Sequence, residues 1–285
     1  MKIIVYILVI KFAFINATRM LAQINQNYEF INYLTQNNKN KEALFLLNQP
    51  NEIKNADTLN FLKGYNYYLM KRPDTAAFIL SKVKAVSNLY TKAKCFEILN
   101  LLYAKKEKLA LVKFDDFCKD TAVIYLPILN TMRAGNYLLL RKYEKFDSIS
   151  YTFRYEDFRL TNEQMKLKEL SFKAKKDYNK SPIKAALLSS VVPGLGKFYA
   201  GKKGAAIASF ASTTALGLMV FESYYRTKNI KSPQVITFGT LFTFFYVGNI
   251  FGSYFSVQQQ IKSTNGKINN EILASIHVPI IRFFK

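Results

Sequence analysis

Residues 64–80 read GYNYYLMKRPDTAAFIL and carry the spacing on which the fold prediction depends. Gly64 is followed by Tyr67 after three positions and by Ala76 after twelve. Leu80 comes four positions after the alanine. A small residue lets two helices approach closely, an alanine packs beneath them, and large side chains fill the space to the next pair of helices. The stretch therefore predicts two packed helices that form a hairpin.

The same pattern recurs along the first half of the chain. Alanines stand 33 and 34 positions apart, and a large residue follows each by four positions: Ala43 and Leu47, Ala76 and Leu80, Ala110 and Phe114. A weaker fourth copy contains Gly135, which matches Gly64. A fixed period of this length indicates a repeat architecture, and we expect helical repeats over residues 24–160. The alternative is a non-repetitive helical bundle, and both give an all-α domain.

The spacing of Gly64, Tyr67 and Ala76 resembles that of the tetratricopeptide repeat family. The resemblance implies an all-α solenoid of helical hairpins, whose concave groove holds an extended peptide or a partner helix. The chain departs from the family pattern at Ile31 and Ile98, which stand at the small-residue position. Groove side chains in such arrays come mainly from the first helix of each hairpin, so the candidate partner-binding residues are Asn60, Lys63, Asn66, Lys94, Glu97 and Asn130.

The N-terminus has the composition of a targeting segment. Lys2 precedes an uncharged apolar run over residues 3–10, and the small residue Ala22 precedes Gln23. These features predict a secretory signal peptide over residues 1–22. The alternative is an uncleaved membrane anchor. A signal peptide would place the helical repeats outside the cytoplasm.

Residues 189–204, SSVVPGLGKFYAGKKG, partly match a phosphate-binding loop. Gly196, Gly201 and Lys202 have the required spacing, but Lys203 stands where such a loop needs Ser or Thr to hold Mg²⁺. The preceding AALLSSVV, residues 185–192, does not have the composition of a buried strand. We therefore expect this segment to belong to a membrane domain and not to a nucleotide site.

Two long uncharged runs follow, over residues 204–221 and 232–261. About 20 apolar residues span a bilayer core, so residues 182–262 predict an interfacial helix and a transmembrane hairpin with a loop over residues 222–231. Small residues four positions apart let helices touch in lipid, and the expected packing positions are Ala205, Ser209, Thr213, Gly217, Gly248, Gly252 and Ser256. Asn249 is expected to hydrogen-bond across the hairpin, although a polar residue in a membrane helix can also mark a functional site.

The segment before this hairpin resembles the P-G-x-G-Q-x-Y-x-G element of the bacterial two-transmembrane domain. The resemblance covers residues 183–261, with Lys197 in place of the usual glutamine. It implies a location in the envelope and an architecture more than an activity. The expected motif residues are Pro193, Gly194, Gly196, Phe198, Tyr199 and Gly201.

The segments on either side of the membrane domain are basic. Thr161 and Gln164 in TNEQ predict a capping box that starts a linker helix over residues 161–181. The lysines of this helix from Lys166 on, and those up to Lys184, are expected to attract anionic lipid headgroups. The tail, residues 263–285, is apolar and basic, and its pattern leaves open an interfacial segment or a docked strand.

Charge and catalytic inventory restrict the function. Lys and Arg number 41 against 19 Asp and Glu, a formal charge of +22, which attracts polyanions or reflects a lysine-rich solvated surface. With one histidine, His277, and two distant cysteines, Cys95 and Cys118, no nucleophilic triad or histidine-rich metal site can be assembled. Whether the cysteines form a disulfide stays open. We expect no enzymatic activity, cofactor, metal or small-molecule substrate.

These observations predict a protein of the bacterial inner membrane whose repeat domain faces the periplasm and binds a protein or peptide as an envelope scaffold. Two alternatives remain. One is a cytoplasm-facing membrane tether that binds polyanions, although nucleic acid is not the partner we expect. The other is a subunit of an oligomeric membrane conduit.

Overall fold

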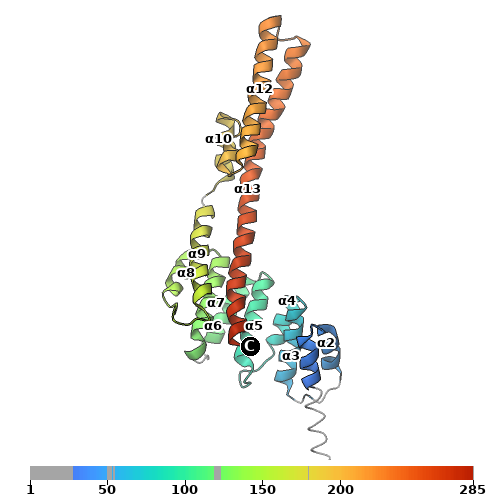
Figure 1. Ribbon diagram of the computed structural model, residues 1–285, viewed down its shortest axis with the longest axis vertical. Helices are drawn as coiled ribbons and strands as arrows, with labels where there is room; N and C mark the ends of the chain where they lie inside the picture. Colours follow the sequence, from blue (N-terminus) through green and yellow to red (C-terminus); the bar gives the residue numbers. More distant parts are fainter. Residues whose placement is uncertain (1–27, 50–52, 54, 119–122, 179, 285) are drawn as a thin grey trace, which may run out of the picture. The chain divides into compact units, whose positions relative to one another are not determined.

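The computed structural model describes residues 28–49, 53, 55–118, 123–178 and 180–284, and all regular elements among them are helices (Figure 1). The predicted signal peptide lies outside these residues. The chain divides into two compact units. The first contains the residues up to Leu167 together with Ile272–Lys285, and the second contains Lys168–Glu271.

Helices of the first unit pack against their neighbours in chain order. Residues 28–36 form the first described helix. The following helices are α2 (Asn40–Asn48), α3 (Ala56–Leu69), α4 (Pro73–Leu80), α5 (Tyr90–Tyr103), α6 (Glu107–Cys118), η1 (Val123–Tyr125), α7 (Leu126–Leu139) and α8 (Tyr143–Ser150). The first helices of three hairpins, α3, α5 and α7, each have 14 residues.

The turns between paired helices share one backbone geometry. In the turn between α3 and α4, Lys71 has φ 57°, its amide donates to the Tyr68 carbonyl, and the Arg72 amide donates to the Tyr67 carbonyl. This left-handed residue with its two bonds is the Schellman ending of a helix. The same arrangement recurs in three other turns, so the left-handed residues are Asn38, Lys71, Lys105 and Arg141, 33, 34 and 36 positions apart. The backbone thus repeats with nearly the period of the sequence pattern.

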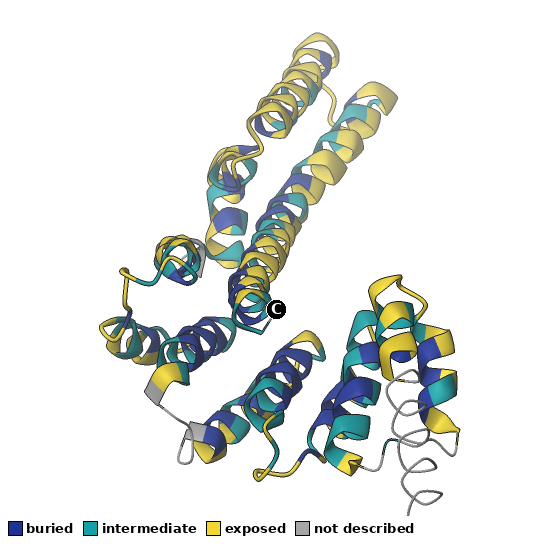
Figure 2. Ribbon diagram, turned by 60° about the horizontal axis from the view of Figure 1, so that its bottom comes forward, coloured by how far each residue is buried: buried dark blue, intermediate teal, exposed yellow. Residues whose placement is uncertain are grey.

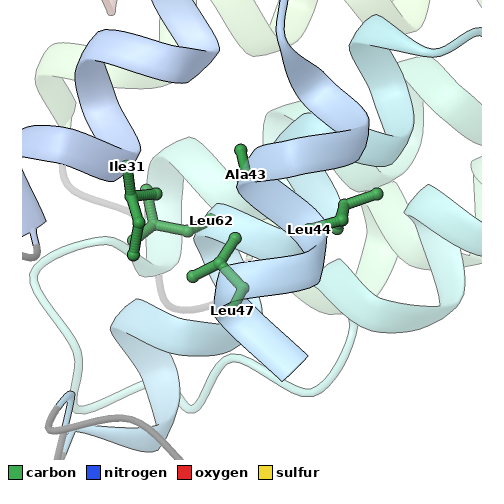
Figure 3. Packing of buried hydrophobic residues seen from close by; sticks show 5 residues of the cluster. All are labelled: Ile31, Ala43, Leu44, Leu47 and Leu62. Carbon is green, nitrogen blue, oxygen red and sulfur yellow. The ribbon is translucent and has the colours of Figure 1, made fainter. Parts of the chain in front are cut away.

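The periodic residues form the core of these hairpins. Ala43, Ala76 and Ala110 are fully buried, as are Leu80 and Phe114. A Cβ on Gly64 would lie 2.6 Å from Leu80 Cγ, so only glycine permits the contact between α3 and α4. Figure 3 shows one cluster, which groups Ile31, Ala43, Leu44, Leu47 and Leu62. Tyr67 packs against this cluster.

Helix α9 (Thr161–Tyr178) begins at the predicted residue, but the predicted capping box is wrong. The Thr161 hydroxyl lies 2.8 Å from the carbonyl oxygens of Tyr155 and Asp157, where it can only donate. The Gln164 side chain is fully buried and donates to the Thr131 hydroxyl at 2.9 Å. Gln164 therefore connects α9 to α7. Its side chain is part of the buried core and does not cap the helix.

The second unit contains α10 (Pro182–Val191), α11 (Leu195–Tyr199), α12 (Lys203–Thr227) and the first part of α13 (Pro233–Phe283). Helices α12 and α13 are long and apolar enough to cross a membrane. Only 11% and 6% of the residues in their most apolar stretches are buried (Figure 2). A helix from a soluble core would be buried there, so exposure of these stretches favours contact with lipid.

Two boundaries differ from the prediction. The loop of the hairpin is shorter than residues 222–231, because α12 continues to Thr227 and its last turns carry a Glu222–Arg226 ion pair at 2.5 Å. The tail is not the docked strand that its pattern left open, because α13 continues to Phe283. Isoleucines four positions apart give this end of the helix one apolar face.

Candidate functional site

The C-terminal end of α13 packs among the first helices of the hairpins (Figure 1). Ile272, Ile276 and Ile280 are completely buried in the first unit. Gly135 on α7 makes room for them, since a Cβ at this glycine would lie 2.5 Å from Ile276 Cδ1 and 3.5 Å from Ile272 Cγ2. The sequence pattern matched Gly135 to Gly64, but the left-handed turns place the buried Ala134, seven positions before Arg141, at the position of Gly64. Gly135 is one position further along α7 and admits the chain's own C-terminal helix.

His277 lies on the same segment between two tyrosines. The Tyr68 hydroxyl on α3 forms a short hydrogen bond with Nε2, and the Tyr103 hydroxyl on α5 lies 3.0 Å from Nδ1. A neutral imidazole can accept from one hydroxyl and donate to the other, so both ring nitrogens are satisfied. Burial lowers the pKa of His277 and raises the pKa of Tyr103. The site therefore favours the neutral imidazole.

The end of the helix is fastened to α9 and the segments beside it. Arg282 lies 2.9 Å from Glu163 Oε2 on α9 and also donates to the Arg159 carbonyl at 3.2 Å. The guanidinium of Arg159 stacks 3.9 Å from the centre of the Phe283 ring, and Phe284 stacks on Tyr125. The segment thus contacts α3, α5, α7 and α9. Of these, α3, α5 and α7 are the first helices of hairpins, on which partner binding was predicted.

A cavity of about 430 Å³ stays open beside this segment. It is lined by His277 and the two tyrosines together with Leu69, Lys71, Pro73 and Asn100. Part of the face is therefore accessible while the helix is in place.

The predicted groove residues do not form an open groove. Asn66 and Glu97 are buried, at 0% and 2% exposure. Asn66 donates to the Leu62 carbonyl at 2.9 Å, and Glu97 pairs with Lys94 at 2.6 Å. Asn130 donates to the Thr152 hydroxyl at 3.1 Å. Asn60 and Lys63 are half-buried on α3.

The residues that do line this face were not among the sequence candidates. Tyr68 lies in the last turn of α3, and Tyr103 is the last residue of α5, with no polar pattern to mark either of them. The one signal that could have identified these tyrosines is their distance from the turn that ends each helix. Tyr68 stands three residues before the left-handed Lys71, and Tyr103 stands two residues before the left-handed Lys105.

In the second unit the glycines of the PGLGKFYAG motif, residues 193–201, allow close backbone contact. Gly194 has φ 89°, and a Cβ there would lie 2.3 Å from the Ala206 carbonyl oxygen. A Cβ on Gly196 would lie 2.0 Å from the Ala185 carbonyl oxygen. The motif is thus not a simple turn, since residues 195–199 form the short helix α11 between α10 and α12.

Two buried serines complete this contact. The Ser189 hydroxyl accepts from the Gly196 amide at 2.9 Å and lies 2.7 Å from the Ser253 hydroxyl on α13. The Tyr199 hydroxyl accepts from the Ser181 amide at 3.3 Å, whereas Phe198 is half exposed and available to an interface. Pro193 is half-buried and Gly201 has φ 80° at the start of the turn into α12.

The small residues predicted to pack α12 against α13 contribute unequally to the contact between the two helices. Thr213 and Ser256 are buried, and Ser209 is half-buried. A Cβ on Gly217 would lie 3.3 Å from Phe242 Cε2, and one on Gly252 would lie 3.5 Å from Lys197 Cε. Ala205 is exposed, and a Cβ on Gly248 would have no atom within 4 Å. Close contact in the hairpin therefore depends on part of the predicted stripe.

The cysteines and the possible metal ligands are the remaining polar candidates. Cys95 is buried, and the side chain of Cys118 lies outside the described residues, as does any disulfide between them. Among the residues that the structure describes, no three His, Cys, Asp or Glu side chains are grouped so that they could hold a metal ion. No family model, curated protein or solved structure matches the chain.

Proposed function

We propose that this protein is a membrane-anchored helical-repeat scaffold that binds a helical segment of a protein partner in the bacterial cell envelope. The observation that carries the proposal is the C-terminal segment of α13, which lies on the first helices of the hairpins with Ile272, Ile276 and Ile280 buried. A face that accepts one amphipathic helix has the chemistry to accept another.

The contacts define the partner helix. Gly135 receives a branched side chain, Tyr68 and Tyr103 receive a polar ring, and Glu163 receives a cation nearer the C-terminal end of the helix. A competing helix would carry apolar residues at positions i, i+4 and i+8 and a basic residue near its C-terminus. The recurring left-handed turns support our assignment of the hairpins to a tetratricopeptide-like solenoid.

The apolar, exposed helices α12 and α13 support anchoring in the inner membrane. The signal peptide predicted over residues 1–22 favours a periplasmic repeat domain. Basic side chains near the start of the membrane domain supply the attraction to anionic lipid headgroups. Lys184, for example, is exposed and lies 5.9 Å from the centre of the Tyr199 ring.

The binding face can be tested with the full-length protein in detergent and a labelled peptide of residues 268–285. Ile276→Glu places a charge at a fully buried position and should release the chain's own helix. We expect this variant to bind the peptide and the wild-type protein to bind it weakly. Val278→Glu, at a position 37% exposed, is the matched control and should behave as wild type. Equal peptide binding by all three proteins, or none by any of them, would reject the proposal.

Orientation needs a separate measurement. Protease added to intact spheroplasts should digest the helical-repeat domain, and the mature N-terminus should lie near Gln23. Protection of the hairpins with Met1 retained would instead place them in the cytoplasm and support the polyanion-binding tether.

A further inference from the structure

A partly open cavity in the membrane hairpin contains a group of polar side chains that neither the repeat pattern nor the membrane motif explains. It has a volume of about 290 Å³ and lies between α11, α12 and α13. Its apolar wall includes Phe244 and Phe245. Its polar lining consists of Lys197, Ser209, Ser212, Thr213 and Asn249.

Asn249 is the residue with unmet hydrogen-bonding capacity. It is only 4% exposed, and neither its amide nitrogen nor its carbonyl oxygen has a hydrogen-bond partner among the described residues. The hydrogen bond expected across the hairpin is therefore not formed. A buried amide without hydrogen-bond partners destabilises the fold. A ligand that both accepts and donates hydrogen bonds would satisfy the side chain of Asn249.

Lys197 brings a positive charge to the same cavity. Its ammonium donates to the Ser209 hydroxyl at 2.5 Å. The stem of the side chain passes Gly252, where a Cβ would lie 3.5 Å from Cε. No carboxylate is among the described residues that line the cavity, so an anionic ligand would balance this charge.

We propose that this cavity binds the phosphoryl headgroup of an anionic glycerophospholipid, with phosphatidylglycerol as the best match. A phosphoryl oxygen accepts from the Lys197 ammonium and from the Asn249 amide nitrogen. A glycerol hydroxyl donates to the Asn249 carbonyl oxygen, and the acyl chains lie along the exposed ring of Phe244. Phosphatidylcholine offers no hydroxyl to Asn249 and carries a cation toward Lys197. The proposal rests on the membrane anchoring proposed above and does not depend on what binds to the helical-repeat face.

The test uses full-length protein in detergent, titrated separately with phosphatidylglycerol, phosphatidylcholine and inorganic phosphate. Native mass spectrometry counts the bound molecules, and thermal unfolding reports stabilisation. We expect one phosphatidylglycerol per chain, bound more tightly than phosphatidylcholine. Lys197→Gln and Asn249→Leu should each weaken this binding by about tenfold, because each removes a hydrogen bond to a charged group.

The matched control is Lys203→Gln, which removes the same charge at an exposed position near the same interface. It should change the affinity by less than about twofold, since exposed charges contribute little. Stabilisation by inorganic phosphate alone, abolished in Lys197→Gln, would support the phosphoryl site and assign it to a free ion. Equal lipid binding by wild type, Lys197→Gln and Asn249→Leu would overturn the proposal, as would an equal loss in Lys203→Gln. Circular dichroism verifies that each variant keeps its helix content.

Discussion

Gly135 on α7 lies directly against Ile276 on α13, with no space for a side chain between them: a Cβ on the glycine would come within 2.5 Å of Ile276 Cδ1. Both residues belong to the first unit. The contact joins the fourth copy of the repeat to the C-terminal segment, and it explains why a residue with low helix propensity stands inside a helix.

Replacing Gly135 by leucine should therefore release the C-terminal segment while α7 stays helical. Overpacking of this size costs about 1–3 kcal/mol, which corresponds to amide exchange about 5-fold to 150-fold faster in residues 272–283. Hydrogen exchange of the full-length protein measures this directly. Gly266→Leu is the control, since nothing lies within 4 Å of a Cβ there. Unchanged exchange in Gly135→Leu would show that the contact does not hold the segment.

The position of His277 predicts that acid weakens the same contact. Burial lowers the pKa of His277 from its usual value of 6.5. The released segment therefore takes up a proton at a higher pH than the docked one. The contribution of neutral His277 to the stability of the docked segment is complete above about pH 6.5. It is lost as the pH falls through the lower pKa that His277 has in the docked state. The groups that face the ring are the Tyr68 and Tyr103 hydroxyls, with Lys71 and Asn100 on the same cavity.

Hydrogen exchange of residues 272–283 at about pH 7.5 and about pH 5, corrected for the intrinsic rates, measures this effect. We expect protection to decrease at the lower pH in the wild-type protein and to stay constant in His277→Phe, which cannot titrate. The same loss of protection in both proteins would assign the pH dependence to other groups.

Much of the helical architecture could be predicted because it depends on local sequence. The alanines and glycines at a period near 34 mark positions where helices must touch, and Ala76 and Gly64 are in such contacts. Uncharged runs close to or above the length of a bilayer core likewise predicted α12 and the start of α13. Each of these signals is contained in the residues that form the element.

The candidate site could not be predicted, because it depends on contacts distant in sequence. Asn66 and Glu97 are polar residues on the first helices of hairpins, and only the folded chain shows that their side chains are buried. The isoleucines of the tail predict an apolar helix face. The surface that covers this face is made of residues far away in the sequence, such as Gly135.

The membrane motif yields a prediction at Gly196. Alanine there would place a methyl group 2.0 Å from the Ala185 carbonyl oxygen and 2.7 Å from Ser189 Oγ. The backbone of α10 would have to move, so we expect Gly196→Ala to lower the thermal midpoint of the protein in detergent by several degrees. Gly204→Ala, with no atom near its Cβ, should leave the midpoint unchanged or raise it slightly. A midpoint equal to wild type in Gly196→Ala would mean that α10 and α11 do not pack as described.

Glu97 provides the test that separates a structural role from a binding role. Its carboxylate is 2% exposed, 2.6 Å from Lys94 and 4.0 Å from Lys113. Removing one partner of a buried ion pair costs about 3 kcal/mol, so Glu97→Gln should lower the free energy of unfolding in urea by about this amount. The matched control, Asp115→Asn, breaks the more exposed pair with Arg133 and should cost less than about 1 kcal/mol. At equal folded fraction, Glu97→Gln introduced into the Ile276→Glu protein should leave affinity for the peptide of residues 268–285 unchanged. A loss of peptide affinity without a loss of stability would show that Glu97 takes part in binding.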